Sequence, residues 1–151
     1  MPKITMNELR QFQELVLKVF QCCQDRIQYQ SDKFELPDAE LRCLMLFDEE
    51  RYLTPKGISQ KLRVVKSRVS KIILGLEKKN LIRRIKDPED SRGYLLTLTP
   101  SGKQKLKDVQ RFYDTVHHEV LVQMTADQRK ALLNNLALLK SCMEAGKELM
   151  N

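Results

Sequence analysis

The spacing of apolar residues is helical along this chain except in one region, and that exception limits the folds that the chain can adopt. Through most of the sequence apolar residues recur every three or four positions, a period that predicts amphipathic α-helices. Two short segments, 81–86 and 94–98, depart from this period and are typical of β-strands. The segment 87–93 between them is rich in turn residues. We therefore expect a mostly helical, α+β chain with one β-hairpin whose tip is long and charged.

Local capping signals mark the ends of several helices. Thr5 and Thr125 each precede a Glu or Gln three residues later, which is the pattern of a capping box. Thr54 stands before Pro55, a favoured residue at the first helical position, and Asn80 tolerates the left-handed backbone that ends a helix. The expected helices cover about 5–31, a short segment opened by Pro37, 54–62, a segment that ends at Asn80, and two helices within 100–150.

The helices in the middle of the chain each present one apolar side, which we expect to form the core. These core positions are Leu41, Leu44, Met45, Phe47, Ile58, Leu62, Val69, Ile72, Ile73 and Leu76. The first helix differs, because Leu15, Leu17 and Cys22 widen its apolar surface beyond one stripe. One small domain would not cover that surface, so a partner helix is expected.

The positive charge of the chain is concentrated in one segment. The 151 residues carry a net charge of +7, yet residues 51–92 alone hold thirteen Lys and Arg against four Asp and Glu. A basic block on an otherwise nearly neutral protein is typical of a protein that binds a polyanion. No apolar run approaches the roughly 18–20 residues of a membrane span, and the amino terminus lacks the apolar core of a signal peptide. A soluble cytoplasmic protein without a membrane partner is expected.

Two short helices joined by a tight turn and followed by a hairpin predict a winged helix-turn-helix. An α-helix fits the major groove of DNA, and the second helix of such a pair presents its outward side chains to the base edges. The outward positions here are Lys66, Ser67, Ser70, Lys71 and Leu74, with Arg68 at the flank. Leu74 is expected either to pack against a neighbour or to contact a thymine methyl group.

The hairpin supplies a second set of candidate DNA contacts. Arg92 at its tip suits the narrow minor groove, whose negative potential attracts guanidinium groups. Asp90 is expected either to hold a tip residue such as Arg92 by a charge-assisted hydrogen bond or to act only as a turn residue. Arg83 and Arg84 alternate along a strand, so one is expected to face solvent or phosphate and the other to pack along the lobe.

Three motifs in order carry a resemblance to a known family. They are Leu76-Glu77-Lys78-Lys79-Asn80-Leu81-Ile82, then Asp90-Ser91-Arg92, then Leu96-Thr97-Leu98-Thr99-Pro100-Ser101-Gly102. In these motifs the chain resembles the MarR family of bacterial and archaeal regulators. The resemblance implies a single MarR-type domain over 1–151, with dimerisation helices at about 5–31 and 100–150 and a winged lobe at about 37–99. It also implies a homodimer whose terminal helices interlock and whose two lobes bind a pseudo-palindromic site.

By position, the resemblance implies major-groove contacts from Ser67, Arg68, Ser70 and Lys71, and a minor-groove contact from Arg92. The sequence departs from the family pattern at the start of the recognition helix, where Val65 replaces a capping Ser or Thr. Arg63 occupies a turn position where a small residue is common, and Gly75 is an unusual residue for the exterior of a recognition helix.

The same resemblance leads to hypotheses about regulation. A repressor is favoured over an activator, and a small anionic or aromatic effector is expected to wedge between the dimer helices and the lobe near Tyr29, Phe47 and Tyr113. Affinity for DNA would come largely from phosphate contacts by Lys56, Lys61, Arg83, Arg84 and Lys86.

Two further classes of function stay open, and a third is unfavoured. Cys22, Cys23, Cys43 and Cys142 lack metal-ligand spacing and are expected to be small core hydrophobes, with a thiol-based redox sensor at Cys22 or Cys23 as the alternative. A winged helix that binds another protein is the other alternative. The chain lacks the common catalytic motifs, so we expect no enzyme and no cofactor, and His117 and His118 diverge too far on a helix to share a metal.

Overall fold

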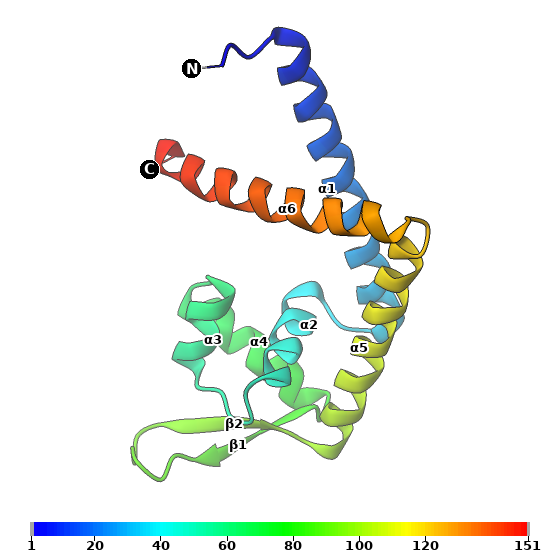
Figure 1. Ribbon diagram of the computed structural model, residues 1–151. Coiled ribbons are helices and arrows are strands. Elements are labelled where there is room, and N and C mark those ends of the chain that lie inside the picture. Colours follow the sequence, from blue (N-terminus) through cyan, green and yellow to red (C-terminus); the bar gives the residue numbers. More distant parts are fainter. Residues whose placement is uncertain (1, 151) are drawn as a thin grey trace. The chain divides into compact units, whose positions relative to one another are not determined.

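The computed structural model describes residues 2–150, which form helices and one two-stranded sheet (Figure 1). The elements are α1 (Met6–Phe34), α2 (Asp38–Met45), the 3₁₀ helix η1 (Leu46–Asp48), α3 (Pro55–Leu62), α4 (Lys66–Lys78), β1 (Ile82–Lys86), β2 (Tyr94–Leu98), α5 (Pro100–Leu121), α6 (Ala126–Gly146) and the 3₁₀ helix η2 (Lys147–Met150).

The chain divides into two compact units, Met1–Val109 and Gln110–Asn151. The first unit holds α1 to β2 and the start of α5, and the second holds the rest of α5, then α6 and η2. The mostly helical fold class with an antiparallel hairpin is confirmed. The single domain over 1–151 stays a prediction.

The core of the first unit lies among α2, α3, α4 and the hairpin (Figure 1). Every core position predicted from the helical spacing is buried except Met45, which is half-buried. Leu36 and Leu96 complete the core from the segment after α1 and from β2. Burial of one such side chain stabilises a fold by about 1.5–3 kcal/mol, so this cluster is the main source of the unit's stability.

The capping signals form the predicted bonds. The Glu8 N–H donates to Thr5 Oγ1 at 3.1 Å while Glu8 Oε2 accepts from the Thr5 N–H at 2.8 Å, and Thr125 and Gln128 repeat this exchange. The α1 helix runs past the predicted end near residue 31, because Gln30 and Phe34 on its last turns are buried in the first unit. It then ends at Glu35 in the left-handed conformation, with φ of 54°.

The junction between the hairpin and α5 explains the Leu-Thr-Pro-Ser-Gly sequence around it. Asn80 ends α4 with φ of 58°, and its carbonyl accepts a hydrogen bond from Thr99 Oγ1 at 2.6 Å. Thr99 Oγ1 in turn accepts from the Gly102 N–H at 2.9 Å. A Cβ atom on Gly102 would lie 1.9 Å from the Leu81 carbonyl oxygen, so only glycine fits where α5 crosses the end of α4.

The hairpin pairs Ile82 with Leu98 at its base and Lys86 with Tyr94 next to its tip. An isolated bridge from Leu53 to Leu96 adds one further ladder position, with N–H to carbonyl distances of 3.0 and 2.8 Å. The β2 strand is therefore paired with β1 along its length and with Leu53 at its middle residue, while the tip at 87–93 extends beyond the paired residues.

The long helices carry apolar side chains that their own units leave uncovered. On α1 these are Leu9, Phe12, Leu15, Leu17, Val19 and Phe20, and on α6 they are Leu133, Leu136, Leu138 and Met143. No residue of α6 is buried within the part of the chain that the structure describes. The predicted need for a partner helix is therefore consistent with the exposure of both helices.

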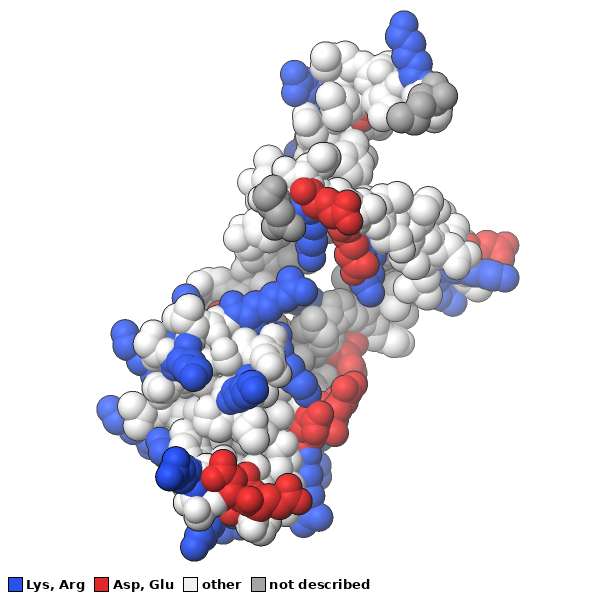
Figure 2. Space-filling view, turned by 90° about the vertical axis from the view of Figure 1, so that its left-hand side faces the viewer, with Lys and Arg blue, Asp and Glu red and all other residues white. Residues whose placement is uncertain are grey.

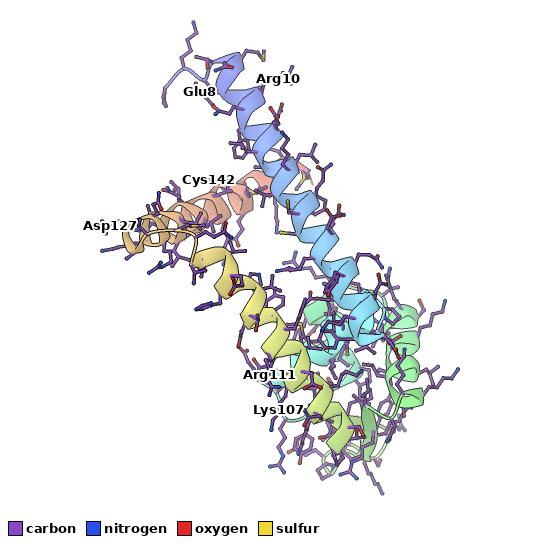
Figure 3. The ribbon with its side chains drawn as sticks, turned by 90° about the vertical axis from the view of Figure 1, so that its right-hand side faces the viewer. Glu8, Arg10, Lys107, Arg111, Asp127 and Cys142 are labelled. Carbon is purple, nitrogen blue, oxygen red and sulfur yellow. The ribbon has the colours of Figure 1, made fainter. Side chains whose placement is uncertain are left out.

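The expectation for the cysteines is right at one position and wrong at three. Cys43 is fully buried, and desolvation by this burial raises the pKa of its thiol to about 12. Cys22, Cys23 and Cys142 are exposed, because the helix faces that carry them are not covered within their units. Figure 3 labels Cys142 on α6. None of the described helices has the length and apolarity needed to cross a membrane.

Candidate nucleic-acid interface

The α4 helix has one buried side and one exposed side. Val69, Ile72, Ile73 and Leu76 face the core, and successive helical residues are about 100° apart, so residues 67, 70, 71 and 74 point the opposite way. The structure exposes all five α4 residues predicted to contact DNA: Lys66, Ser67, Arg68, Ser70 and Lys71. This side of α4 therefore offers hydroxyl and cationic groups on a rigid element.

The start of α4 lacks a side-chain cap, as the sequence predicts. Val65 at the N-cap makes no capping hydrogen bond. The turn before it is instead held by Ser59, whose Oγ donates to the Val64 carbonyl at 2.7 Å and whose own carbonyl accepts from the Val64 N–H at 3.2 Å. Arg63 in this turn adopts the left-handed conformation, with φ of 56°.

Leu74 and Gly75 differ in their surroundings. Leu74 is half-exposed, so it is not packed away against a neighbour among the described residues. Gly75 is not on the exterior as expected, because a Cβ atom there would lie 2.6 Å from Glu40 Oε2 of α2. Glu40 also pairs with Lys79 Nζ at 2.6 Å, so α2 and the end of α4 are held together at this point.

The hairpin separates the two adjacent arginines. Ile82, Arg84 and Lys86 share the face of β1 that carries the buried Ile82, whereas Arg83 lies on the other face and is exposed. Both arginines are exposed, but Arg84 lies on the inner face and contacts Glu77 and Tyr94, so of the two it is Arg84 that packs along the lobe. Contacts of either residue with phosphate stay predictions.

Arg84 is held by one residue of α4 and one of β2. Its Nε lies 3.1 Å from each carboxylate oxygen of Glu77, and its Nη2 lies 2.9 Å from Glu77 Oε1. The Arg84 Cζ atom also lies 4.4 Å from the centre of the Tyr94 ring, within the range of a cation–π contact. The hydrogen bonds with Glu77 raise the pKa of Arg84 above its ordinary value.

Sequence reasoning missed Glu77 and Tyr94 as members of this site. The missing signal was the register of the hairpin, which pairs Lys86 with Tyr94 and so places Tyr94 on the same face as Arg84.

The hairpin tip is shaped by two aspartates. Asp87 Oδ1 accepts from the Glu89 N–H and Asp90 Oδ1 accepts from the Arg92 N–H, both at 2.9 Å. The Asp90 carbonyl also accepts from the Gly93 N–H at 3.1 Å. Asp90 thus bonds the backbone of Arg92 and acts as a turn residue. The Arg92 side chain is exposed and makes no ion pair with the residues that the structure describes.

Basic side chains are spread over the lower part of the molecule in Figure 2, the part that holds the hairpin and the short helices in Figure 1. Of the predicted phosphate contacts, Lys56, Arg83 and Lys86 are exposed, and Lys61 pairs with Glu50 at 3.0 Å. The charge excess of residues 51–92 is therefore presented on the surface of the first unit.

The predicted effector residues have different environments. Phe47 is buried in the core of the first unit and Tyr29 is largely exposed, while the Tyr113 ring in the second unit meets the His117 ring edge-on at 4.4 Å. A hollow of about 370 Å³ is lined by the sequence neighbours of Phe47 and by one lysine of α3, but Phe47 itself does not line it. The lining residues are Met45, Leu46, Asp48, Glu49 and Lys61. The effector site stays a prediction. Residues 2–150 contain no cluster of side chains suited to a metal ion.

The first unit is a winged helix-turn-helix, because α3 and α4 are joined by a tight turn and are followed by the hairpin of β1 and β2. One side of α4 is buried and the other is exposed. Residues 36–94 match the model of the MarR family. The curated HTH-type transcriptional regulator BilQ of Clostridioides difficile is 25% identical over 105 residues, which span 70% of this chain and 71% of BilQ.

Solved structures show the same fold. FabT of Streptococcus pneumoniae, solved in complex with DNA, is similar over 89% of this chain and 98% of its own, with a TM-score of 0.79 and 18% identity. The MepR–DNA complex of S. aureus is similar over 87% of this chain and 98% of its own, with a TM-score of 0.69 and 20% identity. The match to the MarR family model falls on the winged helix of this chain and agrees with the resemblance found in the sequence. The curated relative is a regulator, in agreement with the prediction that this chain is not an enzyme.

Proposed function

We propose that this chain regulates transcription by binding double-stranded DNA as a homodimer. The observation that carries the proposal is the exposed side of α4, where Ser67, Ser70 and Lys71 project from a helix whose opposite side is buried. An α-helix fits the major groove, and hydroxyl and cationic groups form hydrogen bonds with base edges and phosphates. The DNA complexes of FabT and MepR, which share this fold, support the same use of it here.

Each part of the first unit has a proposed role. Ser67, Arg68, Ser70 and Lys71 contact bases in the major groove, with Lys66 at the start of the helix near phosphate. Arg92 enters the adjacent minor groove from the hairpin tip, and Asp90 shapes the turn that presents it. Further phosphate contacts come from Lys56, Lys61, Arg83, Arg84 and Lys86.

The homodimer is supported by the uncovered apolar side chains of α1 and α6. A second copy would remove these side chains from water, which is the main driving force of protein association. Two recognition helices about 34 Å apart would then bind half-sites about ten base pairs apart on one face of the duplex. A pseudo-palindromic operator follows from this symmetry.

Regulation of DNA binding is a further part of the proposal. The protein acts as a repressor in the cytoplasm, and a small anionic or aromatic effector that binds near Tyr29, Phe47 and Tyr113 changes the separation of the two lobes. A redox-sensing alternative is favoured by one observation, the exposure of Cys22 and Cys23, because oxidants reach exposed thiols more readily than buried ones.

A salt titration with genomic upstream DNA tests the proposal. We expect affinity to fall steeply as salt rises, because neutralised phosphates release counterions. We also expect Arg92→Ala to weaken binding about tenfold without changing thermal stability, since the side chain lies at an exposed tip. Arg111→Ala is the matched control, because Arg111 is an exposed arginine of α5 outside the proposed interface (Figure 3).

Four outcomes separate the alternatives. Preference for one upstream fragment over random DNA supports a specific regulator, and its release by peroxide supports the thiol sensor. Absence of DNA binding contradicts the proposed function and favours a protein-interaction module. Equal affinity of Arg92→Ala and the parent contradicts the proposed wing contact.

A further inference from the structure

Glu77, Arg84 and Tyr94 form a cluster that joins three separate elements. Glu77 belongs to α4, Arg84 to β1 and Tyr94 to β2. The Arg84 guanidinium donates three hydrogen bonds of 2.9 to 3.1 Å to the Glu77 carboxylate and stacks against the Tyr94 ring at 4.4 Å. The planar guanidinium is thus held along its edge by a carboxylate and on its face by a ring.

This arrangement differs from the other ion pairs of the first unit. The pairs Lys18–Glu14, Lys61–Glu50 and Lys79–Glu40 each join a lysine to one carboxylate oxygen. The Glu77 carboxylate instead accepts from two nitrogens of a single rigid group. A bidentate pair fixes relative orientation, which a single lysine contact does not.

The position of the cluster connects the two proposed DNA-binding elements. Glu77 lies seven residues, or about two helical turns, after Ser70 and therefore on the same flank of α4. Tyr94 pairs with Lys86 in the last ladder position before the tip that carries Arg92. The buried Ile82 anchors the base of the hairpin, and the buried Leu96, which pairs with Arg84, anchors its middle. The cluster is the polar link between α4 and the hairpin from this middle position to the ladder position next to the tip.

We infer that Glu77, Arg84 and Tyr94 are positioning residues that set the orientation of the wing relative to the recognition helix. The inference rests on the proposed function. When α4 lies in the major groove, the hairpin must lie at a defined angle for Arg92 to reach the adjacent minor groove. In addition to the phosphate contact proposed above, Arg84 acts through this geometry, and its positioning effect depends on Arg92.

A double-mutant cycle on DNA affinity tests the coupling. Glu77→Ala removes the carboxylate from a half-buried flank of a helix, where alanine keeps the helical preference. We expect Arg92→Ala to weaken binding about tenfold in the parent and less than about twofold in the Glu77→Ala background, because a misoriented wing has no contact left to lose. Glu77→Gln keeps one acceptor for Arg84 and is expected to restore part of the effect.

Glu50→Gln is the matched control, since it breaks the surface pair between Glu50 and Lys61 and leaves the cluster intact. The tenfold effect of Arg92→Ala is expected to persist in that background. Hydroxyl-radical footprinting supplies a second measurement, in which Glu77→Ala loses minor-groove protection, and protection of guanine N7 from methylation shows that the major-groove contacts are kept. Circular dichroism and the unfolding midpoint identify any variant whose fold has changed, and Tyr94→Leu then replaces Glu77→Ala in the cycle.

The outcomes distinguish this inference from the proposed function. If Arg92→Ala weakens the parent and the Glu77→Ala variant by the same factor, the positioning role is wrong while the DNA interface stands. If Arg92→Ala leaves the parent's affinity unchanged, the proposed wing contact itself is wrong, and the inference fails with it.

Discussion

Replacing Gly102 with alanine is expected to destabilise the first unit, although alanine normally favours a helix. Gly102 lies in the first turn of α5, where an added Cβ atom would lie 1.9 Å from the Leu81 carbonyl oxygen. Ordinary contact begins at 3.4 Å, so the two segments must separate by about 1.5 Å. Because the obstacle is backbone, no side-chain rotation relieves it.

The magnitude follows from the bonds at this junction. The Thr99 N–H donates to the Leu81 carbonyl at 3.0 Å, and Thr99 Oγ1 donates to the Asn80 carbonyl at 2.6 Å. Losing each costs about 0.5–1.5 kcal/mol, and overpacking adds about 1–3 kcal/mol. The helical preference of alanine offsets about 0.5–1 kcal/mol. The free energy of unfolding should therefore fall by about 3 kcal/mol, which for a chain of this size lowers the unfolding midpoint by about 6–12 °C.

Thermal and urea unfolding followed by circular dichroism measures this effect at one fixed protein concentration. Gly146→Ala is the matched control, because Gly146 ends α6 and an added Cβ atom there meets nothing within 4 Å. That variant should be as stable as the parent or slightly more stable. If Gly102→Ala and Gly146→Ala have the same unfolding midpoint, the close approach of Gly102 to the Leu81 carbonyl does not control stability.

Two further predictions concern the long helices and the thiols. Leu136→Asp on α6 should convert the proposed dimer to a monomer in analytical ultracentrifugation, because the charge would be buried unpaired at the interface. Helix content should be kept, since Leu136 is half-exposed within its unit. A stable dimer in this variant would argue against the proposed role of α6. Cys43 should resist alkylation by iodoacetamide at pH 8.5 until the protein is unfolded, because its thiol is buried with a pKa of about 12, whereas mass spectrometry should find urea-unfolded protein modified at Cys43. Rapid modification of Cys43 in the folded protein would show that its site opens. The raised pKa also means that the stability contributed by neutral Cys43 is complete below about pH 9 and is lost as pH rises towards 12.

The exposed and buried sides of α4 have a consequence for how this protein would evolve new targets. Core residues such as Ile73 are constrained by packing, whereas Ser70 and Lys71 on the other side are exposed. Substitutions on the exposed side are therefore expected to change the proposed DNA binding with little change in stability. The proposed positioning cluster at Glu77 and Arg84 lies between these two cases, because its expected role is in orientation more than in the core.

Features that depend on neighbouring residues followed from the sequence. The capping boxes at Thr5 and Thr125, the proline start at Pro55 and the left-handed end at Asn80 all lie where their residue types predict. Each involves bonds or backbone angles within a few residues, so no distant partner is needed to specify it. The hairpin bounds and the core side of α4 followed for a similar reason, since a residue's spacing fixes the face on which it lies.

Features that depend on what covers a face did not follow. An apolar helix face predicts burial against some surface, but it does not say whether that surface belongs to the same chain. This is why Cys22, Cys23 and Cys142 were expected in a core and are exposed within their units. Gly75 was assigned to the exterior for the same reason, because only the placement of α2 brings the Glu40 carboxylate over it.

The sequence by itself determined the order of the elements, the exposed side of the recognition helix and the concentration of positive charge around it. Tertiary structure alone decided which of two adjacent arginines lies on the inner face and bonds Glu77. Alternation along a strand places neighbours on opposite faces, but only the packing of the hairpin against α4 makes one of those faces the inner one.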